Sequence, residues 1–194
     1  MHAITSAEFV KGVVDPEGLP RDTLPYIAFL GRSNVGKSST LNMLTGNGSL
    51  ARKSSRPGKT TEINMFRINK RVYFADLPGY GYAKQPEPLR LHIEDMIAWY
   101  IADRYITHLR LVMIIDLRVG ATDLDKKMMA DLLATHEAEQ ILVLANKADG
   151  LKQSELAKQL REVQTAFPGI SVVPISARKG TGKKEALMAI FAGL

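Results

Sequence analysis

A glycine-rich loop that ends in a lysine and a serine is the first part of this sequence that could do chemistry. Residues 31–38 satisfy the pattern G-x-x-x-x-G-K-S/T. Glycines let a backbone curl around phosphate oxygens, and the helix that follows presents free N–H groups to the same anion. We expect Lys37 to reach the β- and γ-phosphates of a nucleoside triphosphate and the Ser38 hydroxyl to bind Mg²⁺. The predicted contacts are Gly31, Arg32, Ser33, Asn34, Val35, Gly36, Lys37 and Ser38.

A second chemical group, Asp76-Leu77-Pro78-Gly79, directly follows the apolar run 72–75. A carboxylate at the carboxyl end of a strand lies at the crevice where such sheets bind ligands. We expect Asp76 to hold Mg²⁺ through a water molecule and the Gly79 N–H to contact the γ-phosphate. The loop can relax when that phosphate leaves. In isolation D-x-x-G equally describes a simple turn, but its distance after a phosphate loop favours the functional interpretation.

The long polar loop 46–61 is expected to supply a second hydroxyl to Mg²⁺, because loops of this length in compact domains are usually functional. Thr60 and Thr61 are both candidates, and spacing alone does not separate them. Thr60 is favoured because Pro57-Gly58-Lys59 could present it. The alternative is that either threonine begins the next strand.

Two motifs after the last two apolar runs predict which base is bound. Asn146-Lys147-Ala148-Asp149 follows the run 140–145. Guanine has adjacent donors at N1 and N2, which one carboxylate can accept, whereas an Asp149 facing adenine would lose its hydrogen bonds. We expect Asn146 to serve the N7/O6 side and to brace the phosphate loop, while the Lys147 stem packs over the base.

Ser176-Ala177 follows the run 171–175 and would offer the Ala177 N–H to guanine O6. N-K-x-D after one run and S-A after the next form a strong combined signal. The four motifs in this order predict a guanine-nucleotide site.

Short apolar runs alternate with helical patterns, which favours parallel βαβ units. We predict an α/β, three-layer P-loop GTPase fold with a mostly parallel six-stranded sheet and helices on both faces. One domain is expected over 1–194, with 1–24 as a short N-terminal extension; residues 9–14 could add an edge strand. Predicted strands are 26–30, 63–68, 72–75, 109–115, 140–145 and 171–175, and predicted helices are 37–44, 89–102, 121–135, 154–166 and 182–192.

Positive charge is concentrated in two places. The formal charge is +6, and residues 50–71 hold seven basic side chains against one acidic side chain. Concentrated positive charge favours a polyanionic partner such as RNA; the alternative is a solvated surface with excess lysine. The second cluster is Arg178, Lys179, Lys183 and Lys184.

The absence of cysteine excludes disulfides and thiolate metal sites. The N-terminus lacks the basic start and apolar run of a signal peptide. The most apolar stretches, 111–115 and 141–145, are far shorter than the ~20 residues that a membrane span needs. We expect a soluble, cytoplasmic protein with no membrane partner, and a monomer by default.

These motifs resemble those of the translation-factor-related P-loop GTPases. The strings GRSNVGKSS, RPGKT and DLPGYGYA are similar to those of the EngB (YihA/YsxC) family of bacterial GTPases, and the resemblance covers nearly the whole chain. The chain departs from that family at Asn146, where threonine is common, but N-K-x-D is the general GTPase form.

The resemblance implies a protein that binds GTP and GDP with Mg²⁺, hydrolyses GTP slowly and assists assembly of the large ribosomal subunit, with a link to cell division and septation. Ribosomal RNA then becomes the expected partner of the basic clusters. The magnesium ligands map to Ser38 and Thr60. The nucleotide contacts map to residues 31–38, Gly58, Lys59, Thr60, Thr61, Glu62, Asp76, Leu77, Pro78, Gly79, Asn146, Lys147, Ala148, Asp149, Ile175, Ser176 and Ala177.

Hydrolysis is expected to depend on Lys37, Asn34, Thr60 and Gly79. Many switch GTPases place a glutamine after D-x-x-G, but here the residue is Tyr80, so we predict slow intrinsic hydrolysis; the alternative for Tyr80 is loop packing. Asn34 stands where some related GTPases bind K⁺. Acceleration by K⁺ is therefore a hypothesis, and the alternative is that Asn34 only stabilises the turn.

Two rival functions remain at this point. The chain could be a nucleotide-dependent binding module for a cell-division protein, with incidental hydrolysis. It could also be a nucleotide kinase or ATPase that uses the same phosphate loop, although that leaves residues 146–149 unexplained.

Overall fold

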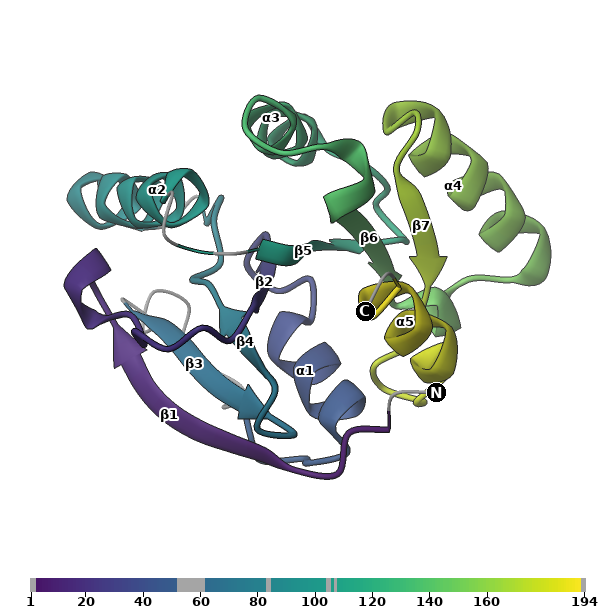
Figure 1. The fold of residues 1–194 in the computed structure, drawn as a ribbon. Helices are drawn as coiled ribbons and strands as arrows, with labels where there is room; N and C mark the ends of the chain where they lie inside the picture. Colours follow the sequence, from purple (N-terminus) through teal and green to yellow (C-terminus); the bar gives the residue numbers. More distant parts are fainter. Residues whose placement is uncertain (1–2, 52–61, 83–84, 104–105, 107, 193–194) are drawn as a thin grey trace.

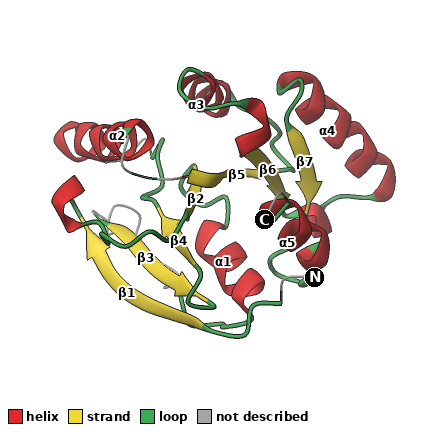
Figure 2. Cartoon of the chain, viewed as in Figure 1, coloured by secondary structure: helices red, strands yellow, loops and turns green. Residues whose placement is uncertain are grey.

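The computed structural model describes residues 3–51, 62–82, 85–103, 106 and 108–192, which form seven strands and five α-helices (Figures 1 and 2). The strands are β1 (Ala7–Val13), β2 (Tyr26–Gly31), β3 (Ile63–Ile68), β4 (Val72–Asp76), β5 (His108–Asp116), β6 (Ile141–Asn146) and β7 (Ser171–Pro174). The helices are α1 (Lys37–Thr45), α2 (Glu87–Ala102), α3 (Asp123–Leu133), α4 (Gln153–Ala166) and α5 (Lys183–Ile190).

The strands form one sheet in the order β1-β3-β4-β2-β5-β6-β7. Strands β4, β2, β5, β6 and β7 are parallel, and β3 is antiparallel to both β4 and β1. The predicted mostly parallel sheet is confirmed, but it has seven strands instead of six because the segment proposed as an extra edge strand pairs with β3. Phe9 and Val10 on that strand are exposed, so its side chains lack the continuous burial seen in β2, β4 and β6.

Alternating side chains of the central strands build two separate cores. On β2, Ile27 and Phe29 pack with α1 and α5, whereas Ala28 and Leu30 pack with α2, α3 and α4. Figure 1 shows the same division: α1 and α5 cover one face of the sheet, and the other three helices cover the opposite face. The predicted three-layer α/β arrangement is confirmed.

Element boundaries differ from the prediction by a few residues, and the differences matter most at the strand ends. Strands β2, β4 and β6 each extend one residue further, to Gly31, Asp76 and Asn146. Helix α3 begins at Asp123, two residues later than predicted, because Thr122 caps it. Three of the predicted site residues, Gly31, Asp76 and Asn146, are therefore the final residues of buried strands.

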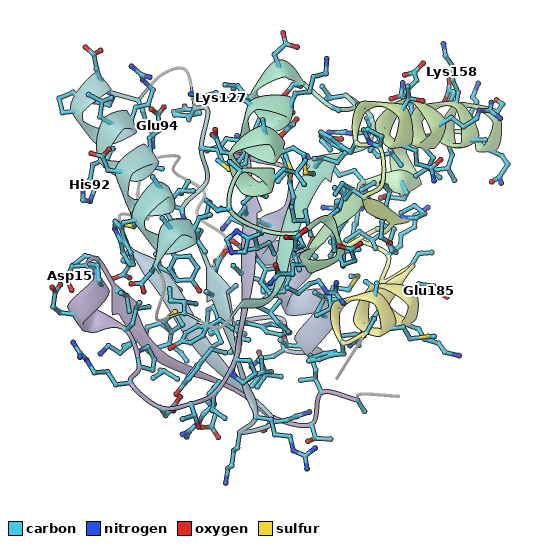
Figure 3. The ribbon with its side chains drawn as sticks, turned by 45° about the horizontal axis from the view of Figure 1, so that its top comes forward. Asp15, His92, Glu94, Lys127, Lys158 and Glu185 are labelled. Atoms are coloured by element: carbon cyan, nitrogen blue, oxygen red, sulfur yellow. The ribbon has the colours of Figure 1, made fainter. Side chains whose placement is uncertain are left out.

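The outer sides of the helices carry charge. Glu94, Lys127 and Lys158 point outward from α2, α3 and α4 and are exposed (Figure 3). No helix in the described ranges has both the length and the apolar character needed to cross a bilayer.

Candidate nucleotide-binding site

Four neighbouring parallel strands deliver polar or glycine residues to one edge of the sheet. Gly31, Asp76, Asp116 and Asn146 are the last residues of β2, β4, β5 and β6. The register aligns Phe29 with Asp76, and Asp116 with Asn146. Carboxyl ends of parallel strands are where sheets of this type bind ligands, so the fold gathers the predicted motifs at a ligand-binding edge.

The phosphate loop lies between β2 and α1 and has the backbone that anion binding requires. Gly36 has φ of 96°, in the left-handed region, and a Cβ there would collide with the side-chain amide of Asn146. Helix α1 has no side-chain cap, and Thr40 is the first residue whose N–H bonds back, to the Gly36 carbonyl at 2.9 Å. The N–H groups of residues 37–39 thus lack a helical partner and can receive an anion.

Lys37 and Asp76 form a buried ion pair at the centre of this edge. Their side chains are 11% and 8% exposed. Each side chain could also bind a ligand: the Lys37 ammonium can donate to phosphate oxygens, and the Asp76 carboxylate can bind a hard cation such as Mg²⁺.

The residues fit a magnesium ion. The two predicted ligands come from adjoining elements: Ser38 lies in the first turn of α1, next to Lys37, and Asp76, which contacts Lys37, ends β4. The described residues contain no cluster of three or more His, Asp or Glu side chains suited to a metal. Mg²⁺ at phosphate-transfer sites needs only one or two protein oxygens, with phosphates and water as its other ligands.

The D-x-x-G loop packs directly on the phosphate loop. Leu77 is buried and its N–H donates to the Phe29 carbonyl at 3.1 Å; Pro78 is buried beside it. The Gly79 carbonyl accepts from the Ser33 hydroxyl at 3.3 Å, and a Cβ on Gly79 would lie only 3.1–3.2 Å from Ser33 atoms. Tyr80 is 6% exposed, so its side chain is packed in the protein interior, in agreement with the loop-packing interpretation.

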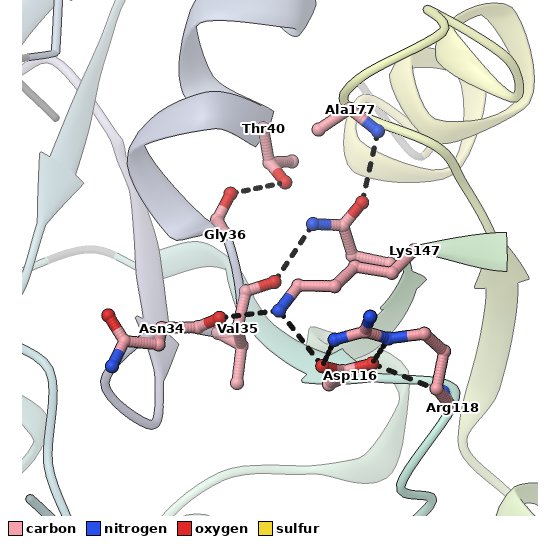
Figure 4. A network of polar contacts seen from close by, with 9 residues as sticks. Asn34, Val35, Gly36, Thr40, Asp116, Arg118, Lys147 and Ala177 are labelled. Atoms are coloured by element: carbon pink, nitrogen blue, oxygen red, sulfur yellow. Dashed lines mark hydrogen bonds and ion pairs between the residues drawn. The ribbon is translucent and has the colours of Figure 1, made fainter. Parts of the chain in front are cut away.

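At the other end of the site, the side-chain amide of Asn146 bridges two loops through bonds to Val35 and Ala177, which Figure 4 labels. Its Nδ2 donates to the Val35 carbonyl at 2.9 Å, and its Oδ1 accepts from the Ala177 N–H at 3.0 Å. The Lys147 ammonium donates to the Asn34 carbonyl at 2.6 Å. The phosphate loop is thus held by the residues predicted to contact the base.

Asp149 lies beside the Ser176-Ala177 loop. The Ser176 hydroxyl donates to Asp149 Oδ1 at 2.7 Å. This hydrogen bond lowers the pKa of Asp149, so the carboxylate is ionised at neutral pH and can accept hydrogen bonds from a base. The neighbouring Ala148 N–H donates to the Ile175 carbonyl at 3.1 Å, which fixes the two loops side by side.

Sequence reasoning missed Asp116, a buried carboxylate that ends β5 beside Asn146 and Lys147. It accepts from Lys147 Nζ at 2.9 Å and from Arg118 Nη2 at 2.7 Å (Figure 4). Burial raises its pKa, but the hydrogen bonds from Arg118 and Lys147 outweigh that effect and hold the pKa at about 2. The signal was available, because Asp116 ends an apolar strand as Asp76 and Asn146 do.

Sequence reasoning also missed Asp125, which lies in α3 and accepts from Arg32 Nε at 3.1 Å. Arg32 is one of the predicted nucleotide contacts, and its guanidinium pairs with this buried carboxylate.

One predicted segment, residues 58–62, is described only in part. Gly58, Lys59, Thr60 and Thr61 lie outside the described residues. Glu62 is described, and its carboxylate lies against Gly12 of the edge strand β1. The remaining predicted contacts all lie at the carboxyl edge of the sheet.

Comparison with known proteins agrees with this geometry. Residues 26–173 match the family model described as "50S ribosome-binding GTPase". A probable GTP-binding protein EngB from Solibacter usitatus is 42% identical over 95% of this chain and 94% of its own length. A probable EngB protein from Bacillus cereus is 40% identical over 96% of this chain and 94% of its own.

Solved structures with the same fold include a probable GTP-binding protein engB, with a TM-score of 0.71 and 25% identity over 86% of this chain and 96% of that one. A structure of Era in complex with MgGDPNP and part of 16S ribosomal RNA gives a TM-score of 0.71 at 24% identity, over 86% of this chain and 55% of that one. The second likeness concerns the fold alone.

Proposed function

The chain belongs to the EngB family of P-loop GTPases, and on that premise we propose that it binds GTP and GDP with Mg²⁺, hydrolyses GTP slowly and acts as a switch in assembly of the large ribosomal subunit. We further propose that residues 1–194 form one GTPase domain and that the protein acts in the cytoplasm. The observation that carries it is the convergence of Lys37, Asp76 and Asp149 at one edge of the sheet.

The phosphate chain of GTP would lie in the loop of residues 31–38. The free N–H groups at the start of α1 donate to its oxygens, and the Lys37 ammonium neutralises negative charge at the β- and γ-phosphates. Once they contact the nucleotide, these groups would stabilise the negative charge that develops on the leaving phosphate.

Ser38 and Asp76 would hold the magnesium ion, with Thr60 as the proposed third ligand. The ion supplies charge neutralisation of the β- and γ-phosphate oxygens. The Gly79 N–H is proposed to contact the γ-phosphate, and its place against Ser33 supports this role because Ser33 belongs to the phosphate loop.

Guanine is proposed to lie against Asp149, which accepts from N1 and N2. The ionised state of Asp149 and its hydrogen bond from Ser176 support this assignment. Lys147 is held by Asn34 and Asp116, so its stem can form one wall of the base pocket. Adenine has an acceptor at N1 and no amino group at C2, so it offers this carboxylate neither donor and is disfavoured.

Slow hydrolysis follows from the position of Tyr80. This residue stands where other switch GTPases orient water with glutamine, but its hydroxyl donates to Asp125 inside the core. The attacking water must therefore be oriented by backbone or by a partner. K⁺ beside Asn34 is proposed as one accelerator; Asn34 is exposed and has a left-handed backbone, with φ of 70°.

A ribosomal partner is supported by the description of the matching family as ribosome-binding and by the positive charge beside the proposed nucleotide site. Arg178 and Lys179 are exposed and follow the Ser176-Ala177 loop directly. Basic side chains near RNA neutralise phosphates, and binding of this kind weakens steeply with salt.

Co-sedimentation with purified large ribosomal subunits tests this proposal. We expect the protein to bind the subunits in the presence of a non-hydrolysable GTP analogue and to bind them more weakly in the presence of GDP. Binding should be lost as the salt concentration rises. The double charge reversal Arg178→Glu with Lys179→Glu should reduce binding, whereas Lys158→Glu on α4 should not. If no subunit binds in either nucleotide while a cell-division protein does, the ribosomal role is wrong.

A further inference from the structure

Asp125 is a fully buried carboxylate that contacts two loops of the nucleotide site. Its exposed fraction is 0%. It accepts from Arg32 Nε, in the phosphate loop, at 3.1 and 3.2 Å, and from the Tyr80 hydroxyl, after the D-x-x-G motif, at 3.3 Å. One buried charge thus joins the phosphate loop to the D-x-x-G loop.

Helix α3 fixes this carboxylate in place. Asp125 lies in the first turn and closes a capping box with Thr122, accepting from the Thr122 N–H at 3.0 Å and from its hydroxyl at 2.6 Å. A buried carboxylate is stable only when it is paired and hydrogen-bonded, so these donors are not easily released. Burial raises the pKa of the Tyr80 hydroxyl, which therefore stays protonated and donates to Asp125.

The backbone of Tyr80 holds the same loop from the other side. Its carbonyl accepts from the Ser33 N–H at 2.9 Å, and Arg32 and Tyr80 form a parallel β-bridge. Gly79, between Pro78 and Tyr80, is thereby kept beside Ser33. All of these partners are protein atoms, so they favour the docked position of Gly79 whether or not a γ-phosphate contacts it.

On the basis of the function proposed above, we infer that Tyr80 and Asp125 are positioning residues that keep Gly79 docked on the phosphate loop and so strengthen the binding of GTP relative to GDP. A ligand gains from a docked loop only through the contact it makes with that loop. GTP would contact Gly79 through its γ-phosphate, which GDP lacks. If the loop were released, the apparent affinity for GTP would fall with the docked fraction, and that for GDP would not change.

The variant Tyr80→Phe tests this inference, because it removes the hydroxyl and keeps the ring. The matched control is Tyr73→Phe. Tyr73 lies on β4, and its hydroxyl donates to the Asp22 carboxylate at 2.7 Å, so this variant loses the same kind of hydrogen bond outside the D-x-x-G loop. Dissociation constants for GDP and for a non-hydrolysable GTP analogue are measured by calorimetry. We expect Tyr80→Phe to weaken binding of the GTP analogue about threefold to tenfold, which corresponds to the loss of one hydrogen bond. Binding of GDP should weaken by less than about twofold. The Tyr73→Phe ratio should equal that of the wild type.

An unchanged ratio, an equal loss for both nucleotides, or tighter binding of the GTP analogue by Tyr80→Phe would overturn the inference. Should that variant not fold, Asp125→Asn gives the same readout, with a larger shift because it also weakens the bond to Arg32. If wild-type protein binds neither nucleotide, the proposed function fails and the positioning role falls with it. If the wild-type protein binds both nucleotides and Tyr80→Phe leaves the ratio of their dissociation constants unchanged, only the positioning role is contradicted.

Discussion

Two lysine–aspartate pairs lie at opposite ends of the same site, and they are built differently. Lys37 and Asp76, at the phosphate end, have no other side-chain partner among the described residues. Lys147 and Asp116, at the base end, belong to a network: Lys147 also donates to a backbone carbonyl, and Asp116 also accepts three hydrogen bonds from Arg118.

The difference indicates that the two ends have different tasks. The isolated pair can exchange partners when ligand binds, since Lys37 can turn to phosphate while Asp76 turns to the cation. The networked pair would have to break several hydrogen bonds to move, so it keeps the wall of the base pocket in place. The phosphate end is therefore the part expected to respond to nucleotide, and the base end is the part expected to stay fixed.

The largest effect is expected from Lys37→Met. This variant removes the cation that faces the phosphates and leaves the buried Asp76 unpaired, so affinity for GDP and GTP should fall by about 100-fold or more. Nucleotide titration measures this change. Lys158→Met is the control, because Lys158 only meets Glu162 at 3.8 Å on an exposed helix face. Retention of wild-type affinity by Lys37→Met would show that the isolated pair has no part in binding.

Asp149→Asn should change which base is bound. The amide can donate to the C2 oxygen of xanthine but cannot accept from two guanine donors as the carboxylate does, so GTP affinity should fall by about 100-fold and xanthosine triphosphate should bind better. Competition between the two nucleotides gives the readout. Unchanged GTP affinity would mean that Asp149 does not contact the base.

Asp116→Asn should have a smaller effect, because Lys147 keeps its bond to Asn34. We expect GDP affinity to fall about threefold to tenfold, with base preference unchanged. An effect as large as that of Lys37→Met would contradict the distinction between the two pairs.

The same variant also changes acid stability. The pKa of Asp116 is about 2 in the folded protein, below its ordinary value of 3.8. The resulting stabilisation is present above pH 4 and is lost as pH falls toward 2. The gap in unfolding free energy between wild type and Asp116→Asn should therefore narrow below pH 4, as measured by chemical denaturation.

Potassium is expected to have the smallest effect. If K⁺ assists hydrolysis beside Asn34, turnover should be several-fold faster in KCl than in NaCl at equal ionic strength, and Asn34→Gly should abolish the difference. Glycine keeps the left-handed backbone at this position, so only the side chain is tested. Equal rates in the two salts would dispose of the potassium hypothesis.

Three of the motifs found from sequence share one property: the phosphate loop, D-x-x-G and N-K-x-D each follow an apolar run that becomes a buried strand. That rule located Asp76 and Asn146, and it applies equally to Asp116, which was missed because no familiar motif surrounds it. Asp125 could not be found in this way, since its contacts with Arg32 and Tyr80 join residues 93 and 45 positions apart.

The fold, like the site, was predictable where strands are buried and not where they are exposed. The buried strands have apolar patterns, so their order along the chain and the two helical layers could be deduced. The edge strand β1 is defined by backbone pairing and has exposed Phe9 and Val10, so its side chains gave only a weak signal. The position of Glu62 against Gly12 depends on the register of that pairing, which no local pattern specifies.

Calorimetric titration of the purified protein with GDP, GTP, ADP and ATP in the presence of magnesium tests the central claim most directly. We predict saturable one-site binding of both guanine nucleotides and no detectable binding of the adenine nucleotides. Absence of heat with GDP and GTP, or equal binding of ADP, would contradict a site in which backbone amides hold the phosphates and Asp149 selects guanine.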